Sequence, residues 1–262
     1  MKFFLAMLFL ISYLFSNEVI YHDNGNIKLE KIYKDNNTTV IKKLYRKNGN
    51  ILQIQVLKNG KLNDIETWYH DNGKIWSELE YKDSQQHGID KEYTKEGFLL
   101  KENLFQYGKK IRIKKYYDNT NLIEVISLYK DNKLHGITKW YYKNGNGRTV
   151  IPYNNAMING ILKSYYKNKQ LKSNITFKNN QPIAIQGYHA NGVLALKSNI
   201  KSGRYNGKLQ EFYDNGEMKN IFYFENGVIK KGLFYDKNGL ITSATSNEML
   251  KLSKEYEKLH AN

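Results

Sequence analysis

The segment WYHDNGKIW, residues 68–76, places His70 and Asp71 side by side between aromatic residues. A histidine next to a carboxylate is a combination that acid–base catalysis and metal binding both use. His22 and His189 occupy the same place in similar segments elsewhere in the chain. Chemistry needs such a pair at one place only, and copies in separate repeats lie too far apart to ligate one metal ion. The recurrence therefore favours a role in turns, and we expect neither a catalytic nor a metal site here.

Paired carboxylates are the next candidates for chemistry. Glu78 and Glu80 project from one face of an expected strand, as the two acids of a glycosidase do, but lysine-rich surroundings favour cross-strand ion pairs. No glycine-rich phosphate loop or serine nucleophile motif is present, and the absence of cysteine excludes disulfides and thiol chemistry. We expect a protein without catalytic residues or a cofactor. Hydrolysis by an unrecognised carboxylate site is the least supported hypothesis.

The stretch from Lys109 to Tyr117 is the most suggestive candidate for binding. Strand alternation puts Lys110, Arg112 and Lys114 on one face, with Tyr116 at its end. Such a face could hold a phosphate or an anionic lipid headgroup. It could equally be a solvated strand face, and both interpretations remain open.

These candidates are embedded in a repeat of 24 residues, counted from Gly73 in both directions, and one-residue deletions place its last three grid positions at Gly192, Gly216 and Gly239. Four residues before each grid position lies an aromatic residue: Tyr21, Tyr45, Tyr69, Tyr93, Tyr117, Tyr141, Tyr165, Tyr188, Phe212 and Tyr235. Two residues after it lies a mostly aliphatic column: Ile27, Ile51, Ile75, Leu99, Ile123, Gly147, Leu171, Leu194, Met218 and Ile241. Ten copies of one module are indicated.

Turn residues punctuate the repeat twice. The first turn is Asn-Gly, as at Asn72-Gly73, which accepts positive φ at little cost. The second follows ten residues later, at Asp35-Asn36, Asn59-Gly60, Asp83-Ser84, Tyr107-Gly108, Asp131-Asn132, Asn179-Asn180, Ser202-Gly203 and Asn226-Gly227. The predicted fold is all-β: an elongated antiparallel β-hairpin repeat array, an open meander or solenoid of about ten 24-residue repeats with about twenty strands.

Two details of the predicted strands follow from the same pattern. In residues 75–81, alternation puts Ile75, Leu79 and Tyr81 on one face and Trp76, Glu78 and Glu80 on the other. A further glycine recurs fifteen residues after the first, at Gly88, Gly136, Gly160 and Gly207. We expect it to let a neighbouring backbone or aromatic ring approach closely.

The two ends of the chain differ from the repeat. Residues 1–16, with Lys2 before an apolar run, predict a signal peptide, with an uncleaved membrane anchor as the alternative. The repeat domain is expected over 17–242 and a C-terminal capping helix and tail over 243–262. The helix should run from Glu248 to His260, be capped by Ser246 or Asn247, and cover the open edge of the last strand.

The alternating Y-x-x-N-G and K-D-x-x-x-H-G units resemble the MORN-type repeat, and more closely its bacterial variant, from about Tyr21 to Leu240. The resemblance implies arrays of β-hairpins that contact proteins or membrane lipid, and no catalytic residues are associated with such repeats. The turns at 119–121 and 167–169 depart from the pattern.

Charge and composition complete the functional expectation. The net charge is +16, carried by lysines that we take to be spread evenly, which is compatible with a solvated surface rather than with nucleic-acid binding. We expect an exported scaffold for protein–protein interaction, antitoxin-like or envelope-associated, in the periplasm, the outer envelope or the medium. The alternative is peripheral binding to anionic lipid or glycan through the basic surface.

Overall fold

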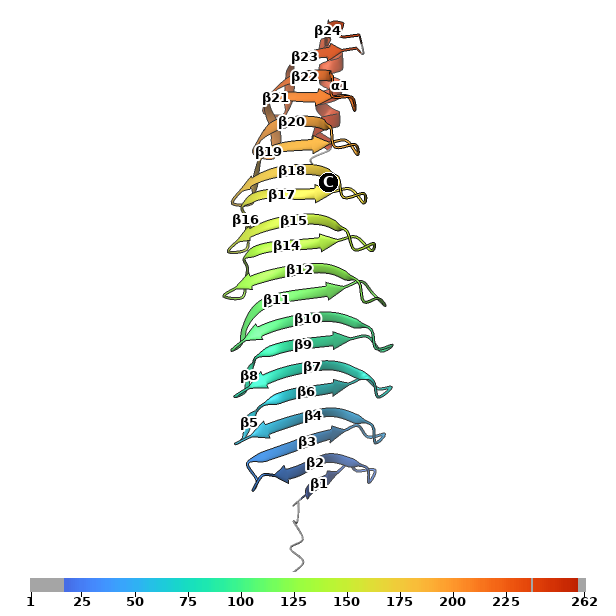
Figure 1. Ribbon diagram of the computed structural model, residues 1–262, viewed down its shortest axis with the longest axis vertical. Helices are drawn as coiled ribbons and strands as arrows, with labels where there is room; N and C mark the ends of the chain where they lie inside the picture. Colours follow the sequence, from blue (N-terminus) through green and yellow to red (C-terminus); the bar gives the residue numbers. More distant parts are fainter. Residues whose placement is uncertain (1–16, 237, 259–262) are drawn as a thin grey trace, which may run out of the picture. The chain divides into compact units, whose positions relative to one another are not determined.

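The computed structural model describes residues 17–236 and 238–258. They form 24 strands and one helix, and the paired strands are antiparallel, so the predicted all-β hairpin array is confirmed. The chain divides into two units. The N-terminal unit comprises the residues up to 99 together with 105–108, and the C-terminal unit comprises 100–104 together with the residues from 109 onward. Within each unit, consecutive strands lie side by side in an open sheet (Figure 1).

The strands of the N-terminal unit are β1 (Asn17–Tyr21), β2 (Ile27–Lys34), β3 (Thr39–Tyr45), β4 (Ile51–Lys58), β5 (Lys61–Leu62), β6 (Asp64–Tyr69), β7 (Ile75–Lys82), β8 (Gln85–Gln86) and β9 (Gly88–Tyr93). Strand β10 (Leu99–Gln106) has residues in both units. The C-terminal unit holds β11 (Lys109–Tyr116), β12 (Ile123–Lys130), β13 (Lys133–Leu134), β14 (Gly136–Tyr141), β15 (Gly147–Asn154), β16 (Met157–Ile158), β17 (Gly160–Tyr165), β18 (Leu171–Lys178), β19 (Gln181–Tyr188), β20 (Leu194–Lys201), β21 (Arg204–Phe212), β22 (Met218–Glu225), β23 (Val228–Tyr235), β24 (Ile241–Ser243) and the helix α1 (Ser246–Lys258).

The two predicted columns meet at the closed end of each hairpin. Tyr69 lies opposite Ile75, whereas Trp68 lies opposite Ser77, so Trp76 is an extra residue that forms a β-bulge. The same register shift occurs beside the aromatic residue of other hairpins, at Tyr21, Tyr45, Tyr116, Tyr141, Tyr165, Tyr188 and Phe212. The bulge is thus a regular part of the module.

This bulge changes which residues share a face. Because paired residues point to the same side of a sheet, Ile75 shares its face with Tyr69 and not with Leu79. Trp76 turns toward Trp68, and the two rings meet edge to face with their centroids 6.2 Å apart. The prediction that Ile75 and Leu79 share one face is therefore wrong, since the extra residue shifts the alternation by one.

Two kinds of turn alternate along opposite edges of each sheet (Figure 1). At the Asn-Gly turns only the glycine has positive φ, 83° at Gly73, and its N–H donates to the carbonyl of His70 at 3.1 Å. This is the geometry of a three-residue hairpin loop. At the second turns both central residues have positive φ, for example 49° at Asp83 and 65° at Ser84, the geometry of a two-residue type I′ turn. The other predicted second turns have this geometry, except that Asp35-Asn36 lies in a longer loop, residues 35–38, in which Asn37 also has positive φ. Asn155-Ala156 is a turn of this kind that the sequence did not indicate.

The two irregular turns differ from each other. Lys169 occupies the glycine position with a φ of 73° and donates its N–H to the Tyr166 carbonyl at 3.0 Å, so this turn is regular apart from its residue type. At the other, Tyr116 and not Tyr117 pairs with Ile123, because the loop contains one residue more. Tyr117 therefore does not belong to the aromatic column, and the assignment to that column is corrected to Tyr116.

The additional glycines explain why there are 24 strands and not twenty. Gly88 has a φ of 107°, and similar positive values occur at Gly136, Gly160, Gly207 and Asp64. Asp64, Gly88, Gly136 and Gly160 each begin a strand. Each of these strands follows a separate strand of two residues, and those short strands are β5, β8, β13 and β16. A Cβ on Gly88 would lie 1.9 Å from Glu80 Oε2, but at Gly207 it would meet nothing within 4 Å. Positive φ, and not the expected close approach, is the requirement these positions share.

Helix α1 starts at Ser246, two residues before the predicted start at Glu248, and its cap differs from the predicted one. The Thr245 hydroxyl accepts the Glu248 N–H at 3.3 Å, and the Glu248 carboxylate accepts the Thr245 N–H at 2.8 Å. This reciprocal arrangement is a capping box, so the cap is Thr245 and not Ser246 or Asn247. The predicted end of the helix, His260, lies outside the described residues.

The helix covers a face of the sheet. The core of the C-terminal unit consists of Ile200, Tyr205, Leu209, Phe222, Phe224 and Ile229, with Met249, Leu252 and Tyr256 of α1 packed against it. Leu209 is 0% exposed and Phe222 1%. The residues of the last strand, β24, remain exposed. The prediction that the helix covers the open edge is wrong, because the large apolar side chains that need cover project from the face.

The N-terminal segment predicted as a signal peptide, residues 1–16, lies outside the described residues. In the part of the chain that the structure describes, no helix is long and apolar enough to cross a membrane.

Candidate binding surface

The recurring histidines link successive repeats. His70 Nε2 lies 3.0 Å from the carbonyl oxygen of Tyr93, and His22 and His189 make the same bond to Tyr45 and Phe212. Other repeats place a different donor at this position: Arg46, Tyr117, Tyr142, Tyr166 and Tyr213 each donate to a backbone carbonyl of the next repeat, over 2.5–3.0 Å. These bonds form a ladder across the repeats, so the turn role predicted for the histidines is confirmed.

Asparagine side chains in the same turns add a second set of links. Asn72 Nδ2 donates to the Lys95 carbonyl at 2.8 Å, and Asn191 Nδ2 donates to the Asp214 carbonyl at 2.8 Å. In these turns, polar side chains therefore hold the next turn. Among residues 17–236 and 238–258, no three histidine, aspartate or glutamate side chains gather as ligands of a metal ion would.

The two strand glutamates have different partners. Glu78 Oε2 lies 3.8 Å from Lys91 Nζ and accepts the Tyr93 hydroxyl at 2.8 Å, which confirms the expected ion pair for this residue. Glu80 Oε2 instead accepts the backbone N–H of Ile89 at 2.9 Å. Both carboxylates serve contacts within the sheet.

Two buried carboxylates were not singled out by the sequence pattern. Glu66, 6% exposed, accepts the side-chain amides of Gln53 and Gln55 at 2.5 and 2.6 Å. Asp90, 2% exposed, accepts the backbone N–H of Glu80 at 3.0 Å and the amide of Gln86 at 2.9 Å. Hydrogen bonds satisfy these carboxylates, which is the condition for burying them, so the arrangement is structural.

The predicted anion-binding cluster on β11 does lie on one face, but its charges have partners within the protein. Lys114 Nζ is 3.0 Å from Glu102 Oε2, and Lys110 Nζ stands 5.5 Å from the centre of the Tyr129 ring. Burial and the charge of Glu102 raise the pKa of Tyr116. Arg112 is half-buried. Anion or lipid contact by Lys110, Arg112, Lys114 and Tyr116 stays a prediction.

From Lys114 a row of directly paired residues continues across the strands of the C-terminal unit. We call it the lysine row, and it consists of Lys114, Ile126, Lys139, Val150, Lys163, Asn174, Gln186, Lys197 and Gln210. Since paired residues share a face, the row defines one side of the sheet, the lysine face. Helix α1 packs on the opposite side, where Leu209 points away from Gln210.

The N-terminal unit has the corresponding row, but there the lysines are paired with acids. Lys43 Nζ lies 3.2 Å from Glu30, as Lys91 lies near Glu78. In the C-terminal unit the places of these acids are taken by Val150 and Asn174, which lie opposite Lys163. Lys139, Lys163 and Lys197 are exposed and form no ion pair with any described residue.

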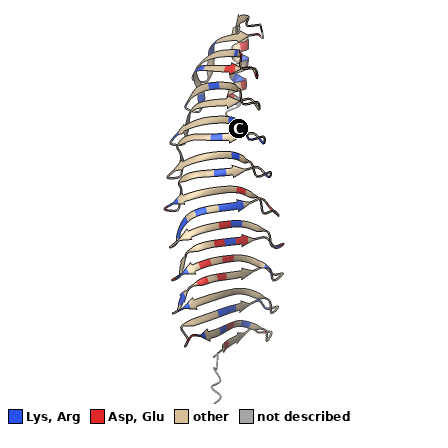
Figure 2. Cartoon of the chain, viewed as in Figure 1, with Lys and Arg blue, Asp and Glu red and all other residues tan. Residues whose placement is uncertain are grey.

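The basic residues are spread evenly, as expected, but the acidic residues are not, so the net positive charge is uneven. Residues 132–210 contain 13 Lys and Arg and no Asp or Glu, whereas residues 17–99 contain 13 of each kind. Figure 2 shows blue without red over β14–β19. The signal was present in the sequence, but a count over the whole chain conceals it. The excess positive charge belongs to one part of the C-terminal unit.

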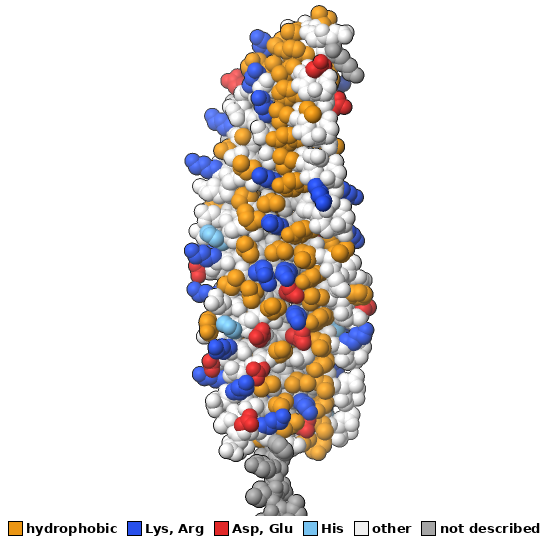
Figure 3. All heavy atoms as spheres, viewed as in Figure 1, with side chains coloured by type: hydrophobic (Ala, Val, Ile, Leu, Met, Phe, Trp, Pro, Cys, Tyr) orange, Lys and Arg blue, Asp and Glu red, His pale blue; other side chains and the backbone are white. Residues whose placement is uncertain are grey.

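Hydrophobic side chains accompany these charges. Ile137 is 36% exposed and Ile161 48%, and each lies two residues before a lysine of the row, on the same face. In the N-terminal unit, Ile65 and Ile89 hold the equivalent positions and are 47% and 39% exposed. Figure 3 shows hydrophobic side chains gathered into a band across the strands of each unit, with lysines among them.

The family comparison agrees with this architecture. The family described as MORN repeat variant matches residues 17–35, 65–83, 134–155, 158–179 and 205–226. The chain is a MORN-variant repeat protein. Each match includes a hairpin or most of one, and the matches begin in β1 and end in the β22–β23 turn. No curated protein matches the chain in sequence.

Membership of this family narrows the class of function. MORN repeats are often involved in binding protein or membrane lipid. In the C-terminal unit of this MORN-variant protein, α1 packs on the face opposite the lysine face and leaves the lysine face uncovered.

Proposed function

We propose that this MORN-variant protein is an exported, non-enzymatic scaffold that binds another protein through its lysine face. The observation that carries the proposal is the contrast between the side chains. Side chains that could do chemistry, such as His70, Tyr142 and Glu66, are engaged in hydrogen bonds within the protein, whereas isoleucines and unpaired lysines face outward.

Exposed aliphatic side chains next to charges favour a protein partner. Isolated exposed apolar residues are ordinary, but a column of them repeated on one face forms a patch, and patches of this kind commonly mark interaction sites. Ile137 and Ile161 form such a column with Lys139 and Lys163 beside it. Apolar contact supplies affinity, and the surrounding charges supply orientation and a faster encounter.

Site-specific photo-crosslinking in the producing cell tests this proposal. A photoreactive residue at Ile137 or Ile161 should yield a discrete cross-linked protein, because both side chains lie on the lysine face. The matched control places the photoreactive residue at Ser173. Ser173 pairs with Ser164 on the neighbouring strand, and both side chains lie on the face of the sheet away from the lysine face. Equal cross-linking from Ser173, or none from the two isoleucine positions, would contradict the scaffold role.

Export depends on residues 1–16. Deleting them should retain the protein inside the cell, and the mature exported protein should begin near residue 17 when its N-terminus is sequenced. Retention of the full chain in the membrane fraction would instead support the anchor interpretation.

A second candidate function is binding of anionic lipid or glycan. The absence of acids between 132 and 210 favours it, because a field of one sign attracts polyanions. Binding to anionic vesicles should then exceed binding to neutral vesicles and should weaken as salt rises toward physiological strength. Equal affinity for the two kinds of vesicle would rule out this alternative.

A further inference from the structure

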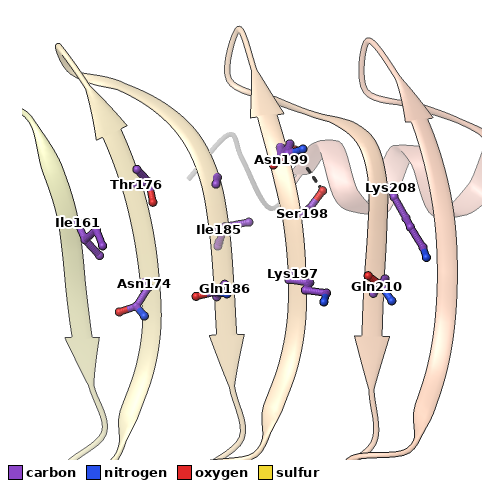
Figure 4. A pocket seen from close by; sticks show the side chains of 11 residues that line it. Ile161, Asn174, Thr176, Ile185, Gln186, Lys197, Ser198, Asn199, Lys208 and Gln210 are labelled. Carbon is purple, nitrogen blue, oxygen red and sulfur yellow. Dashed lines mark hydrogen bonds between the residues drawn. The ribbon is translucent and has the colours of Figure 1, made fainter.

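Within the lysine face, strands β17–β21 form an open groove of about 390 Å³. Its floor includes part of the lysine row, namely Asn174, Gln186, Lys197 and Gln210. Figure 4 shows these side chains projecting from adjacent strands, with Lys208 beside them and α1 behind the sheet. The groove lies inside the segment 132–210 that has no acidic residue.

The lining specifies the chemistry of an occupant. Lys197 and Lys208 are exposed and form no ion pair with any residue that the structure describes, so they call for anionic groups. The side-chain amides of Gln186 and Gln210 offer both donors and acceptors, which match the N–H and C=O groups of a peptide backbone. The groove therefore suits a ligand that combines carboxylates with amides.

Asn174 adds a more specific requirement. Its Oδ1 atom is buried and has no hydrogen-bond partner among the described residues. A buried acceptor without a donor is costly, so turning the half-buried Asn174 amide toward the groove, where a ligand offers an N–H or O–H donor, would be favourable. Fully ionised phosphate or sulfate groups are acceptors only and cannot supply that bond.

The lining also disfavours two other classes of ligand. Single-stranded nucleic acids are held by aromatic side chains on which the bases stack, and the groove is lined by none. A membrane surface is flat, whereas these amides line a hollow, and the apolar contribution comes from Ile161 and Ala184 alone among the outward residues of the lining.

We propose that this groove binds an extended acidic segment of the partner protein, laid across the strands. Successive strands lie about 4.8 Å apart and an extended chain rises about 3.3 Å per residue, so crossing from β17 to β21 takes about six residues. Carboxylates of the segment pair with Lys163, Lys197 and Lys208, and its backbone bonds to the amides of Asn174, Gln186 and Gln210. This inference rests on the proposed role as a protein-binding scaffold and names the chemistry of the partner.

The test uses the full processed chain and a fluorescent peptide of about ten residues in which glutamate alternates with alanine, with anisotropy as the readout. A peptide with glutamine in place of glutamate is the ligand control. The groove variant combines Lys197→Glu with Lys208→Glu, and the matched control combines Lys167→Glu with Lys178→Glu, which are exposed near the turns and change the net charge equally.

The groove variant should bind the glutamate peptide about tenfold or more weakly, because two attractions become repulsions, while the control variant should change by less than about threefold. Asn174→Ala in the otherwise unaltered chain should also weaken binding of the glutamate peptide, but it should leave binding of a sulfated glycan unchanged. If both double variants lose the same affinity for the glutamate peptide, the effect comes from the net charge of the protein and not from the groove, and the inference is overturned.

Other outcomes separate this inference from the broader proposal. If the peptide does not bind but photo-crosslinking at Ile161 captures a partner, the acidic segment is wrong and the scaffold role stands. If anionic vesicles or sulfated glycan bind through Lys197 and Lys208 while the peptide does not, the groove serves a different polyanion and the inference is wrong. If neither the peptide nor the crosslinker detects binding, both proposals fail.

Discussion

The ladder of side chains between repeats can be tested by removing single hydroxyl groups. The Tyr142 hydroxyl donates to the Tyr165 carbonyl at 2.7 Å, and the Tyr166 hydroxyl donates to the Tyr188 carbonyl at 2.8 Å. Both tyrosines are half-buried, and replacing either with phenylalanine keeps the ring. The change therefore isolates one bond between neighbouring repeats.

A net hydrogen bond within a protein contributes about 0.5–1.5 kcal/mol to the free energy of unfolding. We expect Tyr142→Phe to lower that free energy by about 1 kcal/mol. In a protein of this size the midpoint temperature should fall by about 2–4 °C. Tyr142→Phe combined with Tyr166→Phe should cost about 2 kcal/mol, with a departure from additivity if neighbouring repeats are coupled.

The matched control is Tyr188→Phe, because its hydroxyl is 3.3 Å from the exposed Gln186 side chain and joins no second repeat. This variant should change stability by less than about 0.5 kcal/mol. Urea unfolding followed by tryptophan fluorescence measures all three variants, and Trp140, which lies in the same hairpin as Tyr142, contributes to that signal. If Tyr142→Phe is no less stable than Tyr188→Phe, the ladder does not hold the repeats together and the reasoning is refuted.

Two further predictions concern the backbone and the core. Gly88→Ala and Gly207→Ala should both destabilise the fold, by about 1 kcal/mol for the strain of positive φ. Gly88→Ala should cost about 1 kcal/mol more in urea titrations, because the new Cβ displaces the Glu80 carboxylate from its bond to the N–H of Ile89; equal costs would disprove that contact. Burial, and then the charge of Glu211, raise the pKa of Tyr256, so its stabilising contribution is complete below the unfolded value of about 10 and is lost as pH rises above it. Unfolding at rising pH should show a shallower loss of stability above pH 10 in Tyr256→Phe than in the unaltered chain, and parallel curves would refute the assignment.

The fold was largely predictable from the sequence because residues close together in the chain specify the turns and strands of each repeat. The second turns, such as Asp83-Ser84, need two residues that tolerate positive φ, and their residue types announce this. The bulge at Trp76 was not predicted, since a strict period of two gives no sign of an extra residue. The same limitation misplaced Ile75 relative to Leu79.

The candidate surface was only partly readable. The basic cluster on β11 attracted attention as a dense run, yet Lys114 is paired with Glu102, a residue on another strand. The unpaired lysines at Lys163 and Lys197 are separated by 34 positions in the chain and are joined by the strand register. Counting charges over the repeat columns, and not over the whole chain, would have found them.

The sequence by itself determined the module: its length, its two turns, its aromatic and aliphatic columns and the family to which it belongs. These properties arise from local backbone preferences and from strand alternation, which neighbouring residues specify. Only the tertiary structure decided which charges are paired, that His70 bonds the next repeat, and that α1 covers a face and not an edge. Those outcomes depend on the register between strands, and a bulge of one residue is enough to move a side chain to the other side of the sheet.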